Sequence, residues 1–153
     1  MENPDHPMSN VGNEDRAVAV PRDDPDIYQA TLTARRTLEE FIRRIGSPAA
    51  TQQYQAVKVK MMNQVGSDEY FWIPVATFDQ GSFLVGANEH RNSSALLSAN
   101  YPTSIGSDEI YDWMIVDDGI LVGGYSLRVM RAKMDPEQRR QFEKLTWYKF
   151  EKD

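Results

Sequence analysis

The chain has 153 residues, of which 41% are hydrophobic and 26% charged, a balance typical of a single soluble globular domain. It contains no cysteine, which excludes disulfides, thiol catalysis and cysteine-based zinc sites. The net charge of −6 is concentrated in residues 1–26, which hold seven acids and two arginines, so the remainder is near neutral and lacks the basic footprint of a nucleic-acid-binding domain.

Residues 1–23 are predicted to form an acidic, mostly disordered leader, because they offer little apolar surface to bury. Residues 24–153 are then expected to form one domain. The first twelve residues lack the basic and apolar regions of a secretory signal, and no apolar run approaches the roughly 18 residues that span a bilayer. We therefore expect a cytoplasmic protein without membrane contact.

A helix of about 20 residues is predicted after Asp24, a residue suited to an N-cap, with Pro25 in the first turn. Apolar or small side chains then recur every three or four positions, which places them on one buried stripe. They are Ile27, Thr31, Ala34, Leu38, Phe41, Ile42 and Ile45. Gly46 and Pro48 predict the end of this helix.

From Gln53 the period changes to two, which predicts strands. In the first strand Val57, Val59 and Met61 alternate with Lys58 and Lys60, so we expect one buried and one wet face. The second strand, residues 70–78, is apolar on both faces, which is typical of a central strand. Pro74 interrupts it and predicts a bulge or bend, because proline cannot donate to a ladder. Residues 83–87 are predicted to return as a third strand.

The stretch from Asn88 to Asp108 is rich in serine and asparagine, and two interpretations stay open for it. A structureless loop of about 20 residues is uncommon in a compact domain, which favours a short helix over residues 93–100. The alternative is that the whole stretch is a binding loop.

A fourth strand is predicted over residues 109–116, followed by a tight turn at Asp117, Asp118 and Gly119 and a return strand over residues 120–131. The pair Gly123–Gly124 would mark a bulge or bend in that strand. Asp135 and Gln138 form a capping-box pattern that predicts a C-terminal helix to about residue 149. The expected fold is α+β: a strongly bent antiparallel sheet of about five strands, with a partly open small barrel as the alternative. A long N-terminal helix is expected to pack on one side of the sheet and a shorter C-terminal helix to cap the other.

The chain resembles the bacterial YegJ-like family, domain of unknown function 2314 (DUF2314), over about residues 27–145. The segments that carry the resemblance are 34–41 (ARRTLEEF), 57–59 (VKV), 69–72 (EYFW), 86–88 (GAN), 110–114 (IYDWM) and 123–129 (GGYSLRV). Residues 99–106 depart from the family pattern, which leaves the loop before Asp112 outside the resemblance. The resemblance implies a family and no particular activity.

Asp112 beside Trp113 and Glu69 near Trp72 are the candidate chemical groups. If the two carboxylates converged, they could act as a general acid and base or hold a metal. The more ordinary interpretation is that Trp113 belongs to the core and that Asp112 holds a neighbouring backbone segment. Candidate ligand-binding residues are Trp72, Asn88, Trp113 and Tyr125.

No catalytic motif, metal-ligand set or cofactor motif is evident, and the lone domain histidine, His90, lies in a polar stretch. The first hypothesis is therefore a non-enzymatic module that binds an unknown protein or small-molecule partner. The alternative is a hydrolase-type enzyme that uses Asp112 and Glu69, with or without a metal. A weaker third hypothesis is nucleic-acid contact through the basic stretch from Arg128 to Lys152, which the near-neutral domain charge disfavours.

Overall fold

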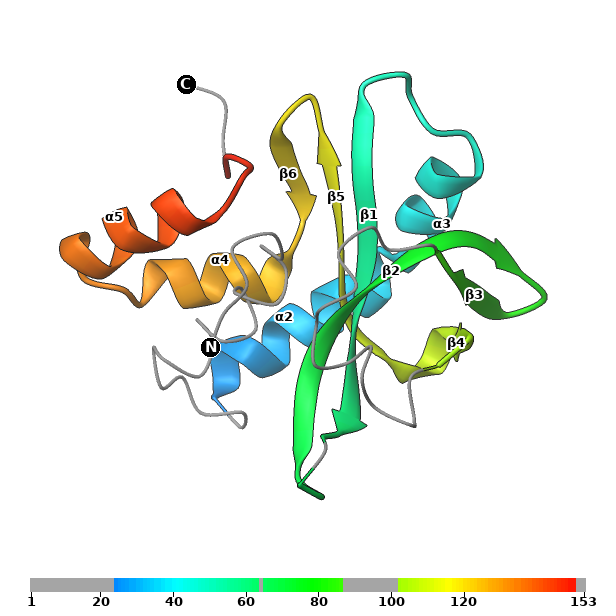
Figure 1. Ribbon diagram of the computed structural model, residues 1–153, viewed down its shortest axis with the longest axis horizontal. Coiled ribbons are helices and arrows are strands. Elements are labelled where there is room, and N and C mark those ends of the chain that lie inside the picture. The colour runs from blue at the N-terminus through cyan, green and yellow to red at the C-terminus, as the bar shows by residue number, and fades with distance from the viewer. Residues whose placement is uncertain (1–23, 64, 87–101, 151–153) are drawn as a thin grey trace.

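The computed structural model describes residues 24–63, 65–86 and 102–150. These residues form an α+β fold with four α-helices and an open antiparallel sheet in the order β4-β3-β2-β1-β5-β6 (Figure 1). The strands are β1 Gln52–Met62, β2 Asp68–Asp79, β3 Ser82–Val85, β4 Ser104–Gly106, β5 Ile110–Asp117 and β6 Ile120–Gly123. The helices are α2 Pro25–Arg36, α3 Leu38–Gly46, α4 Tyr125–Ala132 and α5 Pro136–Leu145, with a short 3₁₀ turn, η1, at Ser107–Glu109.

The long N-terminal helix of the sequence prediction is present but interrupted at Thr37, between α2 and α3. Asp24 caps it as predicted, since its carboxylate accepts from the backbone N–H of Asp26 at 2.8 Å. At the break, the Trp113 indole N–H lies 3.2 Å from the backbone oxygen of Ala34 and 3.1 Å from Thr37 Oγ1. The indole thus uses a carbonyl that a continuous helix would direct to Leu38.

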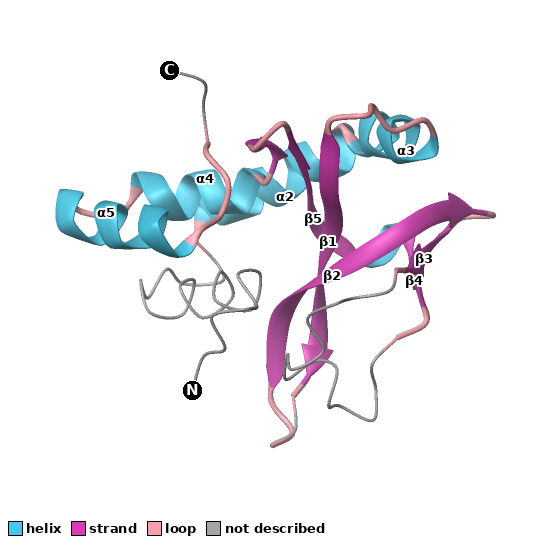
Figure 2. Cartoon of the chain, turned by 45° about the horizontal axis from the view of Figure 1, so that its top comes forward, coloured by secondary structure: helices cyan, strands magenta, loops and turns pink. Residues whose placement is uncertain are grey.

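Strand β2 is central, as predicted, and Pro74 marks the point where it changes partner. Residues from Asp68 to Pro74 pair with β1, whereas residues from Val75 onward pair with β3, with a register shift after Val75. Figure 2 shows β2 crossing β1 and carrying β3 and β4 away from β5. The proline therefore sits at a bend, where its missing N–H costs least.

The sheet has a hydrophobic core on each face. The first contains Phe41, Val57, Ile73 and Trp113 and lies against α2 and α3. The second contains Ala56, Trp72, Met114, Met130 and Phe142, together with Tyr148 and Phe150 from the C-terminal segment, and lies against α4 and α5. The N-terminal and C-terminal helices therefore cover opposite faces, as the sequence predicts.

The predicted return strand over residues 120–131 is wrong beyond Gly123. Strand β6 ends there, and α4 begins after Gly124, which has a left-handed φ of 63°. Residues Ser126, Leu127 and Met130 are buried in this helix, a spacing of one and three that matches a helical face. In the sequence, Tyr125, Leu127 and Val129 alternate with Ser126, Arg128 and Met130, which indicates a strand, but this run is too short to distinguish a period of two from a helical period.

Of three other expectations, the structure confirms one and refines two. The Asp118–Gly119 turn is confirmed, with φ values of 54° and 78°. The capping box of α5 is confirmed, but this helix ends at Leu145 rather than near residue 149. The sheet has a sixth strand, β4, within a stretch read as helix or loop, and it is open rather than a barrel because β4 and β6 lie at opposite ends of the strand order. Residues 93–100 and the leader lie outside the described residues.

Candidate functional site

Asp112 is fully buried on β5 and holds the N-terminus of α4. Its Oδ1 accepts from the backbone N–H groups of Trp113 (2.8 Å) and Tyr125 (3.2 Å). Its Oδ2 accepts from the backbone N–H (2.7 Å) and the hydroxyl (2.6 Å) of Ser126. Because Gly124 at the N-cap position has no side chain, Asp112 supplies the capping oxygens from a neighbouring strand.

Lys58 completes this buried network from β1. It pairs with Asp112 in the sheet register, is only 6% exposed, and its Nζ lies 3.2 Å from Ser126 Oγ. Burial raises the pKa of the Asp112 carboxyl, while the Ser126 hydrogen bonds and the Lys58 charge act in the opposite direction. The expectation of a fully wet lysine face on β1 is thus wrong for Lys58, although Lys60 is exposed.

Glu69 does not join Asp112. On β1, the register partner of Glu69 is Met61 and that of Asp112 is Lys58. Residues three apart on a strand point to opposite faces, so the two carboxylates lie on opposite sides of the sheet. Glu69 instead accepts from Asn63 Nδ2 at 2.7 Å, near the tip of the β1–β2 hairpin.

No metal centre is formed within the described part of the chain, where no three His, Cys, Asp or Glu side chains gather. Asp112 directs its two oxygens toward donors of the protein itself. The arrangement can cap a helix and fix the β5–α4 corner, and it offers no paired acid and base for a substrate.

The aromatic candidates are also separated. Trp113 is in the first core, where it stacks on Phe41 with ring centroids 5.1 Å apart, whereas Trp72 is in the second core. Tyr125 packs edge-on against Trp113 at 5.7 Å and lines a shallow groove of about 460 Å³ between α2 and α4. Asn88 lies outside the described residues.

A group of cations and tyrosines, which we call the cation–tyrosine cluster, lies beside the Asp112 network. It comprises Arg35, Lys58, Lys60, Tyr70 and Tyr111. The Arg35 guanidinium lies 5.3 Å and Lys60 Nζ 5.9 Å from the centre of the Tyr111 ring, and Lys58 Nζ lies 5.1 Å from that of Tyr70. The two rings meet edge to face at 5.1 Å. These distances are within the range of cation–π attraction.

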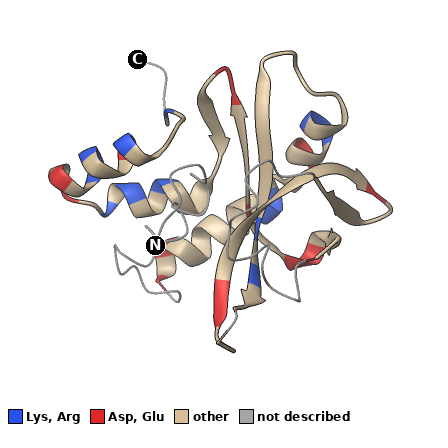
Figure 3. Cartoon of the chain, viewed as in Figure 1, with Lys and Arg blue, Asp and Glu red and all other residues tan. Residues whose placement is uncertain are grey.

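Two of these cations face solvent without an acidic partner. Arg35 and Lys60 are exposed, and within residues 24–63, 65–86 and 102–150 no carboxylate lies within ion-pair distance of either. The Arg35 Nε–H donates to the backbone oxygen of Ile110 at 3.2 Å, which fixes the guanidinium against β5. Figure 3 shows basic positions of α2 and β1 close together, with acidic positions on η1 and at the start of β2.

A groove of about 410 Å³ adjoins the cluster at the end of β1. One wall consists of Val59, Lys60 and Met61, and the other of residues from Pro102 to Glu109 together with Tyr111. Sequence reasoning missed this site. The sequence features that belong to the site are Lys58 and Lys60, which alternate with apolar residues in β1, and Tyr111 in the segment 110–114. Neither feature shows which cation lies against which tyrosine ring.

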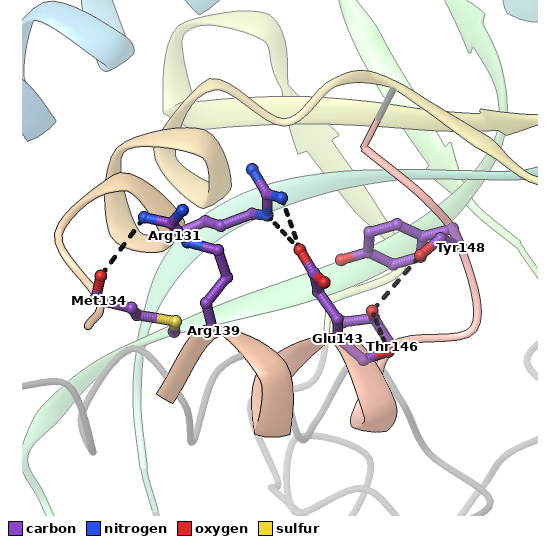
Figure 4. Close-up of polar contacts among 6 residues, drawn as sticks. All are labelled: Arg131, Met134, Arg139, Glu143, Thr146 and Tyr148. Atoms are coloured by element: carbon purple, nitrogen blue, oxygen red, sulfur yellow. Dashed lines mark hydrogen bonds and ion pairs between the residues drawn. The ribbon is translucent and has the colours of Figure 1, made fainter. Parts of the chain in front are cut away.

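A second polar region lies between α4, α5 and the C-terminal segment (Figure 4). There the Arg131 Nε–H donates to Glu143 at 2.7 Å. Among the described residues, the buried Arg139 Nε and Tyr148 hydroxyl have no hydrogen-bond partner, and burial raises the pKa of the Tyr148 phenol. An internal water would satisfy either atom, so they do not identify a ligand.

The chain belongs to the DUF2314 family, described as an uncharacterized protein conserved in bacteria, whose model matches residues 24–150. It is also similar to a putative ankyrin repeat protein of Neisseria meningitidis serogroup B, with 29% identity over 125 residues, which cover 76% of this chain and 49% of that protein. The chain thus spans about half the length of that relative. No solved structure matches the chain. No helix in the described part is long and apolar enough to cross a membrane.

Proposed function

We propose that this member of the DUF2314 family is a non-enzymatic binding module of the bacterial cytoplasm, and that its cation–tyrosine cluster receives an acidic group of a protein partner. The observation that carries the proposal is the exposed pair Arg35 and Lys60, which lie against one tyrosine ring without a carboxylate partner among the described residues. A guanidinium and an ammonium held in this way are suited to a carboxylate, since charge-assisted hydrogen bonds are the stronger ones.

A protein partner is favoured over a small molecule by the relative named as an ankyrin repeat protein. This chain accounts for about half of that relative, and repeat arrays present extended surfaces for binding. A domain joined to such an array is better suited to binding another protein than to converting a metabolite.

A hydrolase is disfavoured by the placement of its two candidate carboxylates. Asp112 caps α4, and Glu69 lies across the sheet from it. A nucleic-acid partner is disfavoured because the domain charge is close to neutral outside residues 1–26.

Charge reversal at the cluster tests the proposal. The probe is a fluorescent glutamate-rich peptide, and the variant is the double substitution Arg35→Glu with Lys60→Glu. We expect its affinity, measured by fluorescence anisotropy, to fall at least about tenfold, which corresponds to 1.4 kcal/mol.

The matched control is Arg43→Glu with Lys144→Glu, which changes the net charge by the same amount at exposed positions of α3 and α5. We expect the control to change affinity less than about twofold, because exposed charges at a distance are screened. Equal losses in both variants would show that only net charge matters and would refute a site at the cluster.

A further inference from the structure

The end of β1 is a strand edge that the fold leaves open. Strand β1 extends to Met62 and is paired with β2 to that residue, through Met62 and Asp68. On its other side the pairing with β5 ends at Val59 and Ile110. Lys60, Met61 and Met62 therefore have a strand partner on one side only, among the residues that the structure describes.

The segment before β5 does not pair with the end of β1 because of its own local structure. A register shift at Tyr111 places an extra residue in β5, and the 3₁₀ turn η1 precedes it. Such bulges bend a strand and end its pairing. The groove of about 410 Å³ lies where β5 would otherwise continue along β1.

The open edge offers hydrogen bonds as well as space. Successive peptide groups of a strand point alternately to its two sides, so at least one of these three residues directs its N–H and C=O away from β2. An extended segment that lay in the groove could pair with these groups, as in other cases of strand addition.

The side chains beside the edge define the chemistry of that segment. In a sheet, paired residues point to the same face. The residue opposite Lys60 would lie on the face of the cation–tyrosine cluster, where Arg35 and Lys60 favour an acid. Val59 is already paired with Ile110, so only one neighbour of that acid, the residue opposite Met61, lies beside the open edge. It would lie on the face where Met61 packs against the first core, and there an apolar side chain fits.

The far wall of the groove limits the number of acids. Asp108 and Glu109 line it, and Glu109 Oε1 already accepts from the backbone N–H of Gly106 at 2.8 Å. These carboxylates would repel a run of acidic residues. A single acid next to an apolar residue satisfies both walls.

We infer that the groove binds an extended segment of a partner protein by adding a strand to the end of β1, with one acidic residue of that segment placed on Arg35 and Lys60. The inference rests on the proposed function, and it specifies the backbone conformation and the residue pattern of the bound segment.

The test uses a capped five-residue peptide with a central glutamate, a valine on each side and a threonine at each end, so that one valine lies opposite Met61 whichever direction the added strand takes. Its binding is followed by NMR through the backbone amide shifts of the full chain. We expect shifts confined to residues 34–36, 59–62 and 102–111 at about 1 mM peptide. We also expect the affinity to fall at least about tenfold with Lys60→Glu or with lysine in place of the central glutamate. Lys144→Glu is the control and should leave affinity unchanged.

A peptide methylated on the glutamate nitrogen and on both valine nitrogens separates strand addition from simple charge attraction, since these N–H groups alternate between the two sides of the added strand. We expect it to lose binding to the same extent, because methylation removes the N–H groups of the added strand. Undiminished binding would refute strand addition and leave the cluster as an anion site, which the glutamate-rich probe reports independently. Absence of binding at about 1 mM, shifts elsewhere, or self-association through the same residues in place of peptide binding would each refute the inference.

Discussion

At the scale of single residues, the environment of Asp112 shows that residues 110–114 have a structural role. An acid beside a tryptophan resembles the mouth of a pocket, but the acid is fully buried and accepts from three backbone N–H groups and one hydroxyl. Sequence reasoning included this structural interpretation, but it could not identify α4 as the element that Asp112 holds, because α4 was predicted as a strand.

Asp112→Asn tests the role of this carboxylate. Whichever way the amide is turned, its NH₂ group faces two donors, so hydrogen bonds are lost inside the protein. We expect the free energy of unfolding to fall by about 1–3 kcal/mol in chemical denaturation. Asp118→Asn, the same change in the exposed turn of the next hairpin, should alter it by less than about 0.5 kcal/mol. A fully stable Asp112→Asn protein that no longer binds its partner would contradict the structural role.

The same residue predicts a dependence on pH. Burial raises the pKa of Asp112 above its ordinary value of 3.8, so the folded state holds the proton more tightly than the unfolded state. The contribution of this group to the free energy of unfolding is then fully present below the ordinary pKa and declines as the pH rises through the folded-state pKa.

We therefore expect the difference in unfolding free energy between the wild type and Asp112→Asn to be largest at acid pH and to narrow as the pH rises. Denaturant titrations of both proteins across the acid range measure it directly. A difference that widened with rising pH would show that the hydrogen bonds and Lys58 outweigh burial and lower the pKa instead.

At the scale of elements, the sequence predicted most of the secondary structure that depends on caps and turns. The start of α2, the capping box of α5 and the Asp118–Gly119 turn are all confirmed, because each depends on residues adjacent in the chain. The break at Thr37 and the start of α4 were not predicted. Both depend on contacts with Trp113, which is distant in the sequence, so no local pattern could report them.

Gly123 shows why the β6–α4 corner needs its glycine pair. Its φ is 74°, and a Cβ placed on it would lie 2.6 Å from the Trp113 ring and 2.7 Å from the Trp113 backbone oxygen. We expect Gly123→Ala to lower the free energy of unfolding by roughly 3 kcal/mol, through left-handed strain and overpacking together.

Gly119→Ala provides the matched control for this substitution. Gly119 has a similar φ of 78°, but a Cβ there meets nothing within 4 Å. Its cost should therefore be limited to backbone strain of about 1 kcal/mol. Equal costs at the two glycines, measured by thermal or chemical denaturation, would show that contact with Trp113 is unimportant at this corner.

At the scale of the whole molecule, the fold class and the opposite placement of the N-terminal and C-terminal helices were predictable, since they follow from amphipathic periods. The candidate binding site was not. It depends on the register that places Lys60 beside Tyr70 and on the bulge at Tyr111. Register and bulges are fixed by pairing across the sheet, which a single sequence does not display.

An open sheet has two outer strands whose backbone groups are unpaired on one side. In this protein the C-terminal segment covers one of them, β6. After α5 the chain turns back, and Lys149 forms a parallel bridge with Ile120 on the outer side of β6. Its N–H donates to the Gly119 oxygen at 2.8 Å, and its oxygen accepts from Leu121 at 2.7 Å. This segment also delivers Tyr148 and Phe150 to the second core.

Lys149→Pro tests whether the backbone bridge of Lys149, rather than its charged side chain, protects the outer edge of β6. Proline removes the N–H that bonds Gly119, so we expect the free energy of unfolding to fall by roughly 1–3 kcal/mol and the exposed edge of β6 to promote self-association. Lys149→Ala keeps the N–H and removes the same exposed charge. Chemical denaturation and light scattering of the two variants should therefore diverge, with the alanine protein remaining close to the wild type. If both variants self-associated equally, the lysine charge would protect this edge, and the backbone bridge would not.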